Sequence, residues 1–92
     1  MVAPSRGSVV LVPFPFSDLS QAKFRPAVVL AAVGKGDWVL CQVTSKAYGD
    51  DKAILISEND FESGRLRVDS FARPGELFTA HESLFHGEAG RL

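Results

Sequence analysis

Apolar residues in this chain gather in short runs separated by turn residues, a pattern that predicts β-strands. Strand signals of this kind stand at residues 8–12, 27–33, 38–44, 53–56, 66–72 and 76–78. The run at 27–33 is apolar on both faces, so we expect it in the middle of the core. Residues 66–72 alternate between apolar and polar, which predicts a half-buried strand. Short strands joined by tight turns favour a mainly β fold, a small closed or nearly closed barrel.

Prolines and glycines punctuate these strands. Pro13 and Pro15 cannot donate to a β-ladder, so residues 13–16 must leave the sheet or lie at its edge, after a strand that ends at Val12. Pro26 suits the first residue of the following strand. Loops or turns are predicted at residues 17–23, 34–37, 48–51 and 73–75, where Gly, Pro, Asp and Ser are concentrated.

Two short helical turns are also predicted. Ser57 and Asp60 stand at the spacing of a capping box, and Gly64 is placed to end this turn in the left-handed conformation. Thr79 is a candidate N-cap for a second turn that holds residues 82–84.

Length and composition indicate one folded domain over residues 1–92, with 46% hydrophobic and 23% charged residues. The net charge of -1 lacks the large basic excess of a duplex-DNA binder, so any nucleic-acid site must be local. Cys41 is the single cysteine, which excludes an intramolecular disulfide and favours a cytoplasmic location. No apolar run is long enough to cross a membrane, and no secretion signal is expected.

Arg25 and Thr44 form a candidate phosphate-binding site. The strands that carry them are joined by the turn at residues 34–37, and this pairing places residue 44 opposite roughly residue 26 or 27. We therefore expect Thr44 and Arg25 to lie close together at one end of the sheet. A guanidinium can grip two phosphate oxygens at once, and a hydroxyl can donate to a third.

Four segments resemble the PemK/MazF toxins. They are Arg-Gly-Ser followed by four apolar residues (6–12), Gln-Ala-Lys-Phe-Arg-Pro-Ala-Val-Val (21–29), Gln-Val-Thr-Ser-Lys (42–46), and Leu-Arg-Val-Asp-Ser-Phe leading to Leu-Phe-Thr (66–79). The resemblance runs in order over nearly the whole chain. Ser8 replaces a usual acidic residue, Ser20 replaces a frequent glutamate, and the chain stops at Leu92, about where the family's C-terminal helix would begin.

The resemblance implies an SH3-like barrel, usually a homodimer, that cleaves single-stranded RNA at short sequences without a metal or other cofactor. It also implies a small acidic antitoxin as partner, with Arg25 matching the family's catalytic arginine and Thr44 its catalytic threonine. RNA supplies its own nucleophile, the 2′-hydroxyl, so the enzyme must stabilise charge and hold the attack in line. Residues predicted to contact RNA are Phe16, Ser17, Gln21, Lys23, Phe24, Ser45 and Lys46.

Other interpretations stay open. Arg25 could form a surface ion pair with Asp18 or Asp37. A gyrase-inhibiting toxin resembling CcdB would need neither Arg25 nor Thr44, and a peptide-binding SH3-like module would show an aromatic groove.

The remaining candidates are interpreted as structural. His81 and His86 are discounted as an acid–base pair because they lie in a weakly structured tail, and they are too few for a metal site. Cys41 is interpreted as a small buried hydrophobe, and the carboxylates of Asp50 and Asp51 as a solvated turn.

Overall fold

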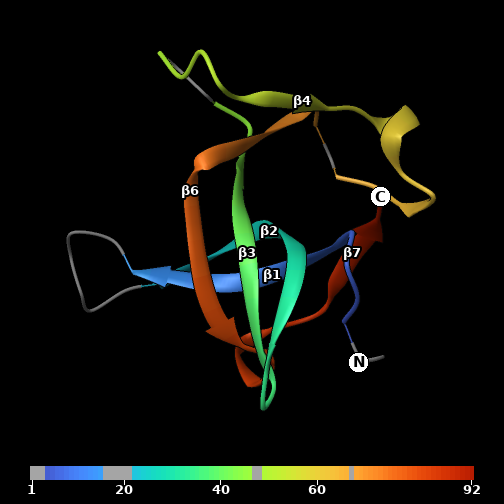
Figure 1. The fold of residues 1–92 in the computed structure, drawn as a ribbon. Helices are drawn as coiled ribbons and strands as arrows, with labels where there is room; N and C mark the ends of the chain where they lie inside the picture. Colours follow the sequence, from blue (N-terminus) through green and yellow to red (C-terminus); the bar gives the residue numbers. More distant parts are fainter. Residues whose placement is uncertain (1–3, 16–21, 47–48, 67) are drawn as a thin grey trace.

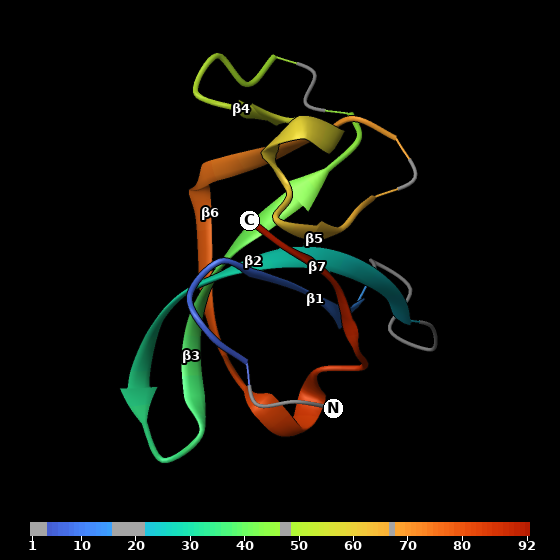
Figure 2. The ribbon, with the colours of Figure 1, turned by 90° about the vertical axis from the view of Figure 1, so that its right-hand side faces the viewer.

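The fold is a curled antiparallel sheet, seen in a computed structural model that describes residues 4–15, 22–46, 49–66 and 68–92 (Figure 1). The strands are β1 (Ser8–Pro15), β2 (Ala22–Gly34), β3 (Asp37–Thr44), β4 (Ile54–Ile56), β5 (Ser63–Gly64), β6 (Ser70–His81) and β7 (Glu88–Arg91). They form one sheet in the order β4-β6-β3-β2-β1-β7-β5. The sheet bends into a half-barrel (Figure 2), which confirms the small β-barrel predicted from the sequence.

The hairpin of β2 and β3 sets the register of the central strands. Gly34 pairs with Asp37 across the two-residue turn Lys35–Gly36, whose φ angles of 57° and 82° are both positive. This geometry matches the right-handed twist of the flanking strands. Ala27 pairs with Gln42 further along the hairpin. The turn predicted at residues 34–37 is therefore confirmed.

β1 continues beyond its predicted end at Val12 and pairs with β2 as far as Pro15. The Leu11 amide donates to the Gly87 carbonyl at 3.1 Å, so it points away from β2. Alternate residues of a strand direct their amides to the same side, which turns the ring nitrogens of Pro13 and Pro15 away from β2 as well. The prolines thus lie at the edge of the sheet, one of the two predicted outcomes, and no ladder bond to β2 is lost.

Pro26 lies inside β2 rather than at its start, because β2 begins at Ala22. Pro26 is paired with Leu11, whose amide points away from β2. Both members of such a pair direct their nitrogens outward, so the Pro26 nitrogen faces the β3 side. Pairing with β3 begins at Ala27, so the missing donor interrupts no pair of this ladder.

Two apolar clusters cover opposite faces of the central strands. One contains the buried residues Val10, Val12, Ala27, Val29, Leu40 and Phe85, with Trp38 and Phe78 packed against it. The other contains Val9, Val28, Val43 and Ile56, with Phe61 and Leu66 packed against it. Cys41 is 5% exposed, which confirms its assignment to the interior. Successive residues of β1 and β2 alternate between the clusters, as the two-residue period of a strand requires.

A large bulge of four residues interrupts the pairing of β6 with β3. Leu77 pairs with Cys41 and Ala72 with Val43, so residues 73–76 stand opposite Gln42 alone. The predicted turn at residues 73–75 is therefore wrong as a boundary between two strands, because β6 runs from Ser70 to His81 as one strand. Its start at Ser70 also shortens the strand predicted at residues 66–72. The bulge lets Arg73, Pro74 and Gly75 project without ending the pairing with β3.

The first helical turn, η1 (Glu58–Asp60), is confirmed, because the Ser57 amide donates to Asp60 Oδ2 at 2.8 Å. It ends at Phe61, whose amide donates to the Glu58 carbonyl at 3.2 Å, and Gly64 instead belongs to β5. Gly64 has a φ of 70°, and its lack of a Cβ allows β5 to approach Ala89 and Gly90 of β7 closely.

The second turn, η2 (Glu82–Leu84), is capped by His81, whose Nδ1 accepts from the Ser83 amide at 3.0 Å. The predicted cap, Thr79, lies inside β6. β7 was not predicted, and it pairs with both β1 and β5. The end of the chain is thus part of the sheet rather than a weakly structured tail. No helix in the described ranges is long and apolar enough to cross a bilayer.

Candidate functional site

Arg25 and Thr44 share one face of the sheet at neighbouring strand ends. Arg25 is paired with Val12, and Ala27 is paired with Gln42. Residues two apart in a strand point to the same face, so Arg25 lies on the face of Ala27 and Thr44 on the face of Gln42. Continuing this register by two residues brings Thr44 opposite Arg25. The expected proximity of Arg25 and Thr44 is confirmed, although Thr44 lies opposite Arg25 rather than opposite residue 26 or 27.

Both residues are half-buried and line one cavity of about 490 Å³. Its lining combines apolar residues (Leu11, Pro26, Val43, Leu66, Val68 and Ala89), one aromatic ring (Phe24), hydroxyls (Thr44, Ser45 and Ser70) and two arginines (Arg25 and Arg65). Arg65 forms an ion pair with Glu58, 3.3 Å from Nη1 to Oε1. Both side chains are exposed to solvent, so this ion pair restrains the position of the Arg65 side chain only weakly. Two guanidiniums and several hydroxyls on an apolar lining suit a phosphate with an attached organic group.

The hydroxyl of Thr44 organises the chain that follows it. Thr44 Oγ1 accepts from the Lys46 amide at 3.1 Å and donates to the Lys46 carbonyl at 3.3 Å. This local turn ends β3 and leaves Ser45 and Lys46 exposed beside the cavity. Rotation of the hydroxyl frees its proton for a ligand while the bond from the Lys46 amide remains.

A polar cluster centred on Arg73 lies next to this pair. Arg73 Nε contacts Asp50 Oδ2 at 2.8 Å, Nη1 donates to Gln42 Oε1 at 3.3 Å, and Nη2 lies 3.8 Å from Glu76 Oε1. The hydrogen bond from Arg73 holds the pKa of Asp50 below its usual range, and Asp50 in turn raises the pKa of Arg73.

The prediction that Asp50 is a solvated turn carboxylate is wrong, because its side chain is only 16% exposed and is paired with Arg73. The cluster assembles only when the bulge of β6 carries Arg73 toward the loop that contains Asp50. Sequence reasoning missed it because Arg-Pro-Gly reads locally as an ordinary turn.

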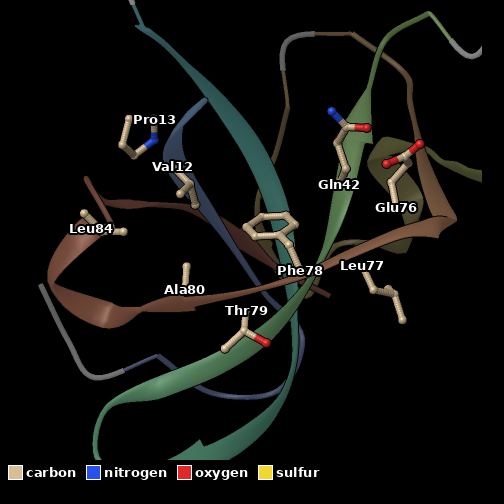
Figure 3. A pocket seen from close by; sticks show the side chains of 9 residues that line it. All are labelled: Val12, Pro13, Gln42, Glu76, Leu77, Phe78, Thr79, Ala80 and Leu84. Carbon is tan, nitrogen blue, oxygen red and sulfur yellow. The ribbon is translucent and has the colours of Figure 1, made fainter. Parts of the chain in front are cut away.

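A second cavity, of about 440 Å³, is shown in Figure 3. It is lined by Val12, Pro13, Gln42, Glu76, Leu77, Phe78, Thr79, Ala80 and Leu84. Val12 is the cross-strand partner of Arg25, and Gln42 precedes Thr44 by two residues on β3. The second cavity therefore adjoins the Arg25–Thr44 pair.

The predicted RNA-contact residues fall in three groups. Phe24 is 52% exposed, and Ser45 and Lys46 are exposed next to Thr44. Lys23 lies in β2, but its side chain is not among the described groups. Phe16, Ser17 and Gln21 lie outside the described residues, as does Asp18, one of the alternative partners of Arg25.

The other alternative partner of Arg25 is excluded by the fold. Asp37 pairs with Gly34 at the turn of the hairpin, whereas Arg25 lies beyond the other end of the pairing between β2 and β3. An extended strand rises about 3.3 Å per residue, so the two side chains are too far apart for an ion pair.

His86 is placed by the sheet and lies against Phe24. Its amide donates to the Leu11 carbonyl at 2.8 Å, and its ring centroid is 4.2 Å from that of Phe24 at an interplanar angle of 48°. His81 is occupied as the cap of η2. The two histidines therefore serve different parts of the fold. Among the described residues, no three His, Cys, Asp or Glu side chains gather as a metal site.

Burial raises the pKa of the Cys41 thiol, which disfavours the thiolate. This agrees with the interpretation of Cys41 as a buried hydrophobe rather than a nucleophile.

The chain matches a known protein family. A family model described as PemK-like, MazF-like toxin of type II toxin–antitoxin system matches residues 5–92. A search of curated proteins finds no match. The matched range includes every described residue of both cavities and of the Arg73 cluster.

Proposed function

This chain belongs to the PemK-like, MazF-like toxins of type II toxin–antitoxin systems, and from this membership we propose that it is an endoribonuclease that cleaves single-stranded RNA without a metal ion. The observation that carries the proposal is the placement of Arg25 and Thr44 on one face, at adjoining strand ends, in the lining of one cavity. A guanidinium and a hydroxyl in that arrangement can hold one phosphate between them.

The proposed reaction uses the nucleophile within RNA. The 2′-hydroxyl oxygen bonds to the adjacent phosphorus, the bond to the 5′-oxygen breaks, and a 2′,3′-cyclic phosphate remains. The proton of the 2′-hydroxyl passes to water, and water protonates the departing 5′-oxygen. Arg25 stabilises the charge that develops on the phosphorane oxygens, and Thr44 donates to one of them and fixes the line of attack.

Flanking residues extend this site along the RNA. Lys46 and Ser45 contact neighbouring phosphates, and the exposed ring of Phe24 stacks on an unpaired base. Further RNA contacts in this proposal are Phe16, Ser17, Gln21 and Lys23.

Membership in this toxin family implies an antitoxin partner. We take this partner to be a small acidic protein, because an extended acidic peptide complements the same cations that bind RNA. Cleavage of mRNA would arrest translation and growth. We further propose a cytoplasmic location, a homodimer and a single functional domain over residues 1–92.

The test is cleavage of a defined single-stranded RNA by the purified protein in the presence of EDTA, with both product ends mapped. Cuts that leave a cyclic phosphate or a 3′-phosphate support the proposal. Intact RNA, or cleavage that EDTA abolishes, contradicts it. A gyrase supercoiling assay on the same preparation examines the alternative CcdB-like activity.

A further inference from the structure

The second cavity combines an apolar lining with one polar end. Its apolar lining comes from Val12, Pro13, Leu77, Phe78 and Leu84, and its polar end from Gln42 and Glu76. Figure 3 shows the Phe78 ring directed into the space between these groups. A volume of about 440 Å³ lies within the range of small-ligand sites. A flat aromatic ligand with a polar edge fits this combination.

Arg73 fixes the orientation of the Gln42 amide. Its guanidinium has donors only, so the amide atom that faces it, 3.3 Å from Nη1, must be the oxygen. The Gln42 oxygen is seen on the side of Glu76 and the nitrogen on the opposite side (Figure 3). Within the described ranges, Arg73 is the only side-chain partner of this amide. The Gln42 nitrogen therefore presents donors to a ligand.

Glu76 supplies the complementary acceptors. Its Oε1 lies 3.8 Å from Arg73 Nη2, so the ion pair keeps the carboxylate near Gln42. This distance is longer than that of a hydrogen bond. The Glu76 side chain is 55% exposed, so the carboxylate stays open to a ligand. Arg73 thus holds one donor group and one pair of acceptor oxygens at the same end of the cavity.

We propose that this cavity binds an unpaired guanine of the RNA substrate, with Gln42 and Glu76 reading its Watson–Crick edge. Guanine presents an acceptor, O6, followed by two donors, N1–H and N2–H. In this proposal a donor from Gln42 serves O6, and the two acceptor oxygens of Glu76 serve N1–H and N2–H. Uracil offers acceptor, donor and acceptor, and the edges of adenine and cytosine begin with a donor, so none of them satisfies the whole set.

The position of the cavity suits a base next to the cleaved phosphate. Val12 lies opposite Arg25, and Gln42 lies two residues before Thr44, all on the same face. Gln42 and Glu76 are therefore specificity residues for the endoribonuclease proposed above, on which this inference rests.

The experiment is a titration of the protein and its variants with GMP, IMP, AMP, CMP and UMP, followed by the backbone amide NMR signals of the residues that line the cavity. GMP should bind about tenfold or more tightly than AMP, CMP and UMP. IMP lacks only the N2 amino group, so its affinity should lie between that of GMP and those of the other nucleotides. Glu76→Gln and Gln42→Glu keep the size of the side chain. Each should lower the affinity for GMP by about tenfold and change the affinity for UMP little.

Glu62→Gln is the matched control, because Glu62 is exposed and does not line the cavity. It should bind GMP as the unmodified protein does, and amide spectra of all three variants report whether they fold. Equal affinity for the four standard nucleotides, or GMP affinity unchanged in both cavity variants, overturns the inference.

A cleavage assay separates this inference from the proposed function. RNAs that differ at one position near the cut should be cleaved fastest with guanine there, and Glu76→Gln should lose that preference. Cleavage without any preference for guanine, together with a flat titration, refutes the guanine site and leaves the endoribonuclease intact. Selective GMP binding by a protein that cuts no RNA supports the cavity assignment and contradicts the endoribonuclease.

Discussion

Arg73 holds Asp50 through a contact of 2.8 Å between Nε and Oδ2, which joins the bulge of β6 to the loop that follows Thr44. The same guanidinium bonds to Gln42 on β3. One side chain therefore fixes the relative positions of a bulge, a loop and a strand, and each of these borders the candidate site. Removing either partner should loosen the segment that carries Ser45 and Lys46.

The ion pair makes stability depend on pH in a defined direction. The pKa of Asp50 is lowered by Arg73, so the pair stabilises the fold at pH values above the ordinary carboxyl pKa of 3.8. That contribution is lost as the pH falls through the lower pKa of the folded protein. Asp50→Asn should therefore lower the free energy of unfolding at about pH 7, and its difference from the unmodified protein should shrink toward about pH 3.

Urea unfolding at several pH values measures this effect. Asp51→Asn is the control, because Asp51 is exposed and adjacent in sequence. It should leave the free energy of unfolding nearly unchanged at every pH. A constant deficit of Asp50→Asn down to the lowest pH would show that the carboxylate charge is not what stabilises the pair.

Replacing Arg25 tests the role that the proposed endoribonuclease mechanism gives to its charge. Arg25→Ala should lower kcat for RNA cleavage by about 10²–10³, because the phosphorane loses its cationic donor. Arg25→Lys should recover only part of the rate, since an ammonium cannot hold two phosphate oxygens in a plane. Single-turnover kinetics measure the rates, with exposed Arg6→Ala as the charge-matched control. Full activity in Arg25→Ala would remove Arg25 from the mechanism.

Two substitutions at Thr44 distinguish the contribution of its hydroxyl from that of its side-chain shape. Thr44→Val keeps the shape and removes the hydroxyl, so cleavage should fall by about 10- to 100-fold. It should also lower the free energy of unfolding by about 1 kcal/mol, because the Lys46 amide loses its acceptor. Thr44→Ser keeps the hydroxyl and should retain most of the activity. Equal rates for the valine and serine variants would argue that the hydroxyl takes no part.

Gly90 tests how closely β5 and β7 approach. A Cβ built at Gly90 would lie 2.7 Å from the Ser63 carbonyl oxygen and from the Phe61 ring. Gly90→Ala should therefore lower the free energy of unfolding by about 1–3 kcal/mol. Gly75→Ala is the matched control, since a Cβ there meets no atom within 4 Å, and it should change stability by less than about 0.5 kcal/mol. Thermal or urea unfolding measures both, and equal effects would refute the packing argument.

The central hairpin could be predicted because its information is local. Gly34 and Gly36 flank Lys35 in a turn that needs positive φ, and the apolar runs on either side fix the register. The proximity of Arg25 and Thr44 follows from that register alone. The amino-acid sequence therefore suffices to predict this part of the candidate site.

The Arg73 cluster and β7 could not be predicted because they depend on contacts distant in sequence. Residues 88–91 read Glu-Ala-Gly-Arg, without a β-branched or aromatic side chain, so only pairing with β1 and β5 makes them a strand. The bulge of β6 likewise depends on how β3 and β6 align, and Arg-Pro-Gly reads as a turn between two strands rather than as a bulge within one. Gln42 and Asp50 become partners of Arg73 only through that alignment.

The prolines of β1 limit how another chain can approach this molecule. Beyond Leu11, the outward-facing backbone positions of β1 are Pro13 and Pro15, so this edge offers carbonyl oxygens without N–H donors. A peptide added there as an extra strand would leave its own carbonyls unmatched, and β-sheet aggregation along the edge is disfavoured for the same reason. Along Pro13 and Pro15, recognition by another chain therefore depends on side chains rather than on donation from the backbone of β1.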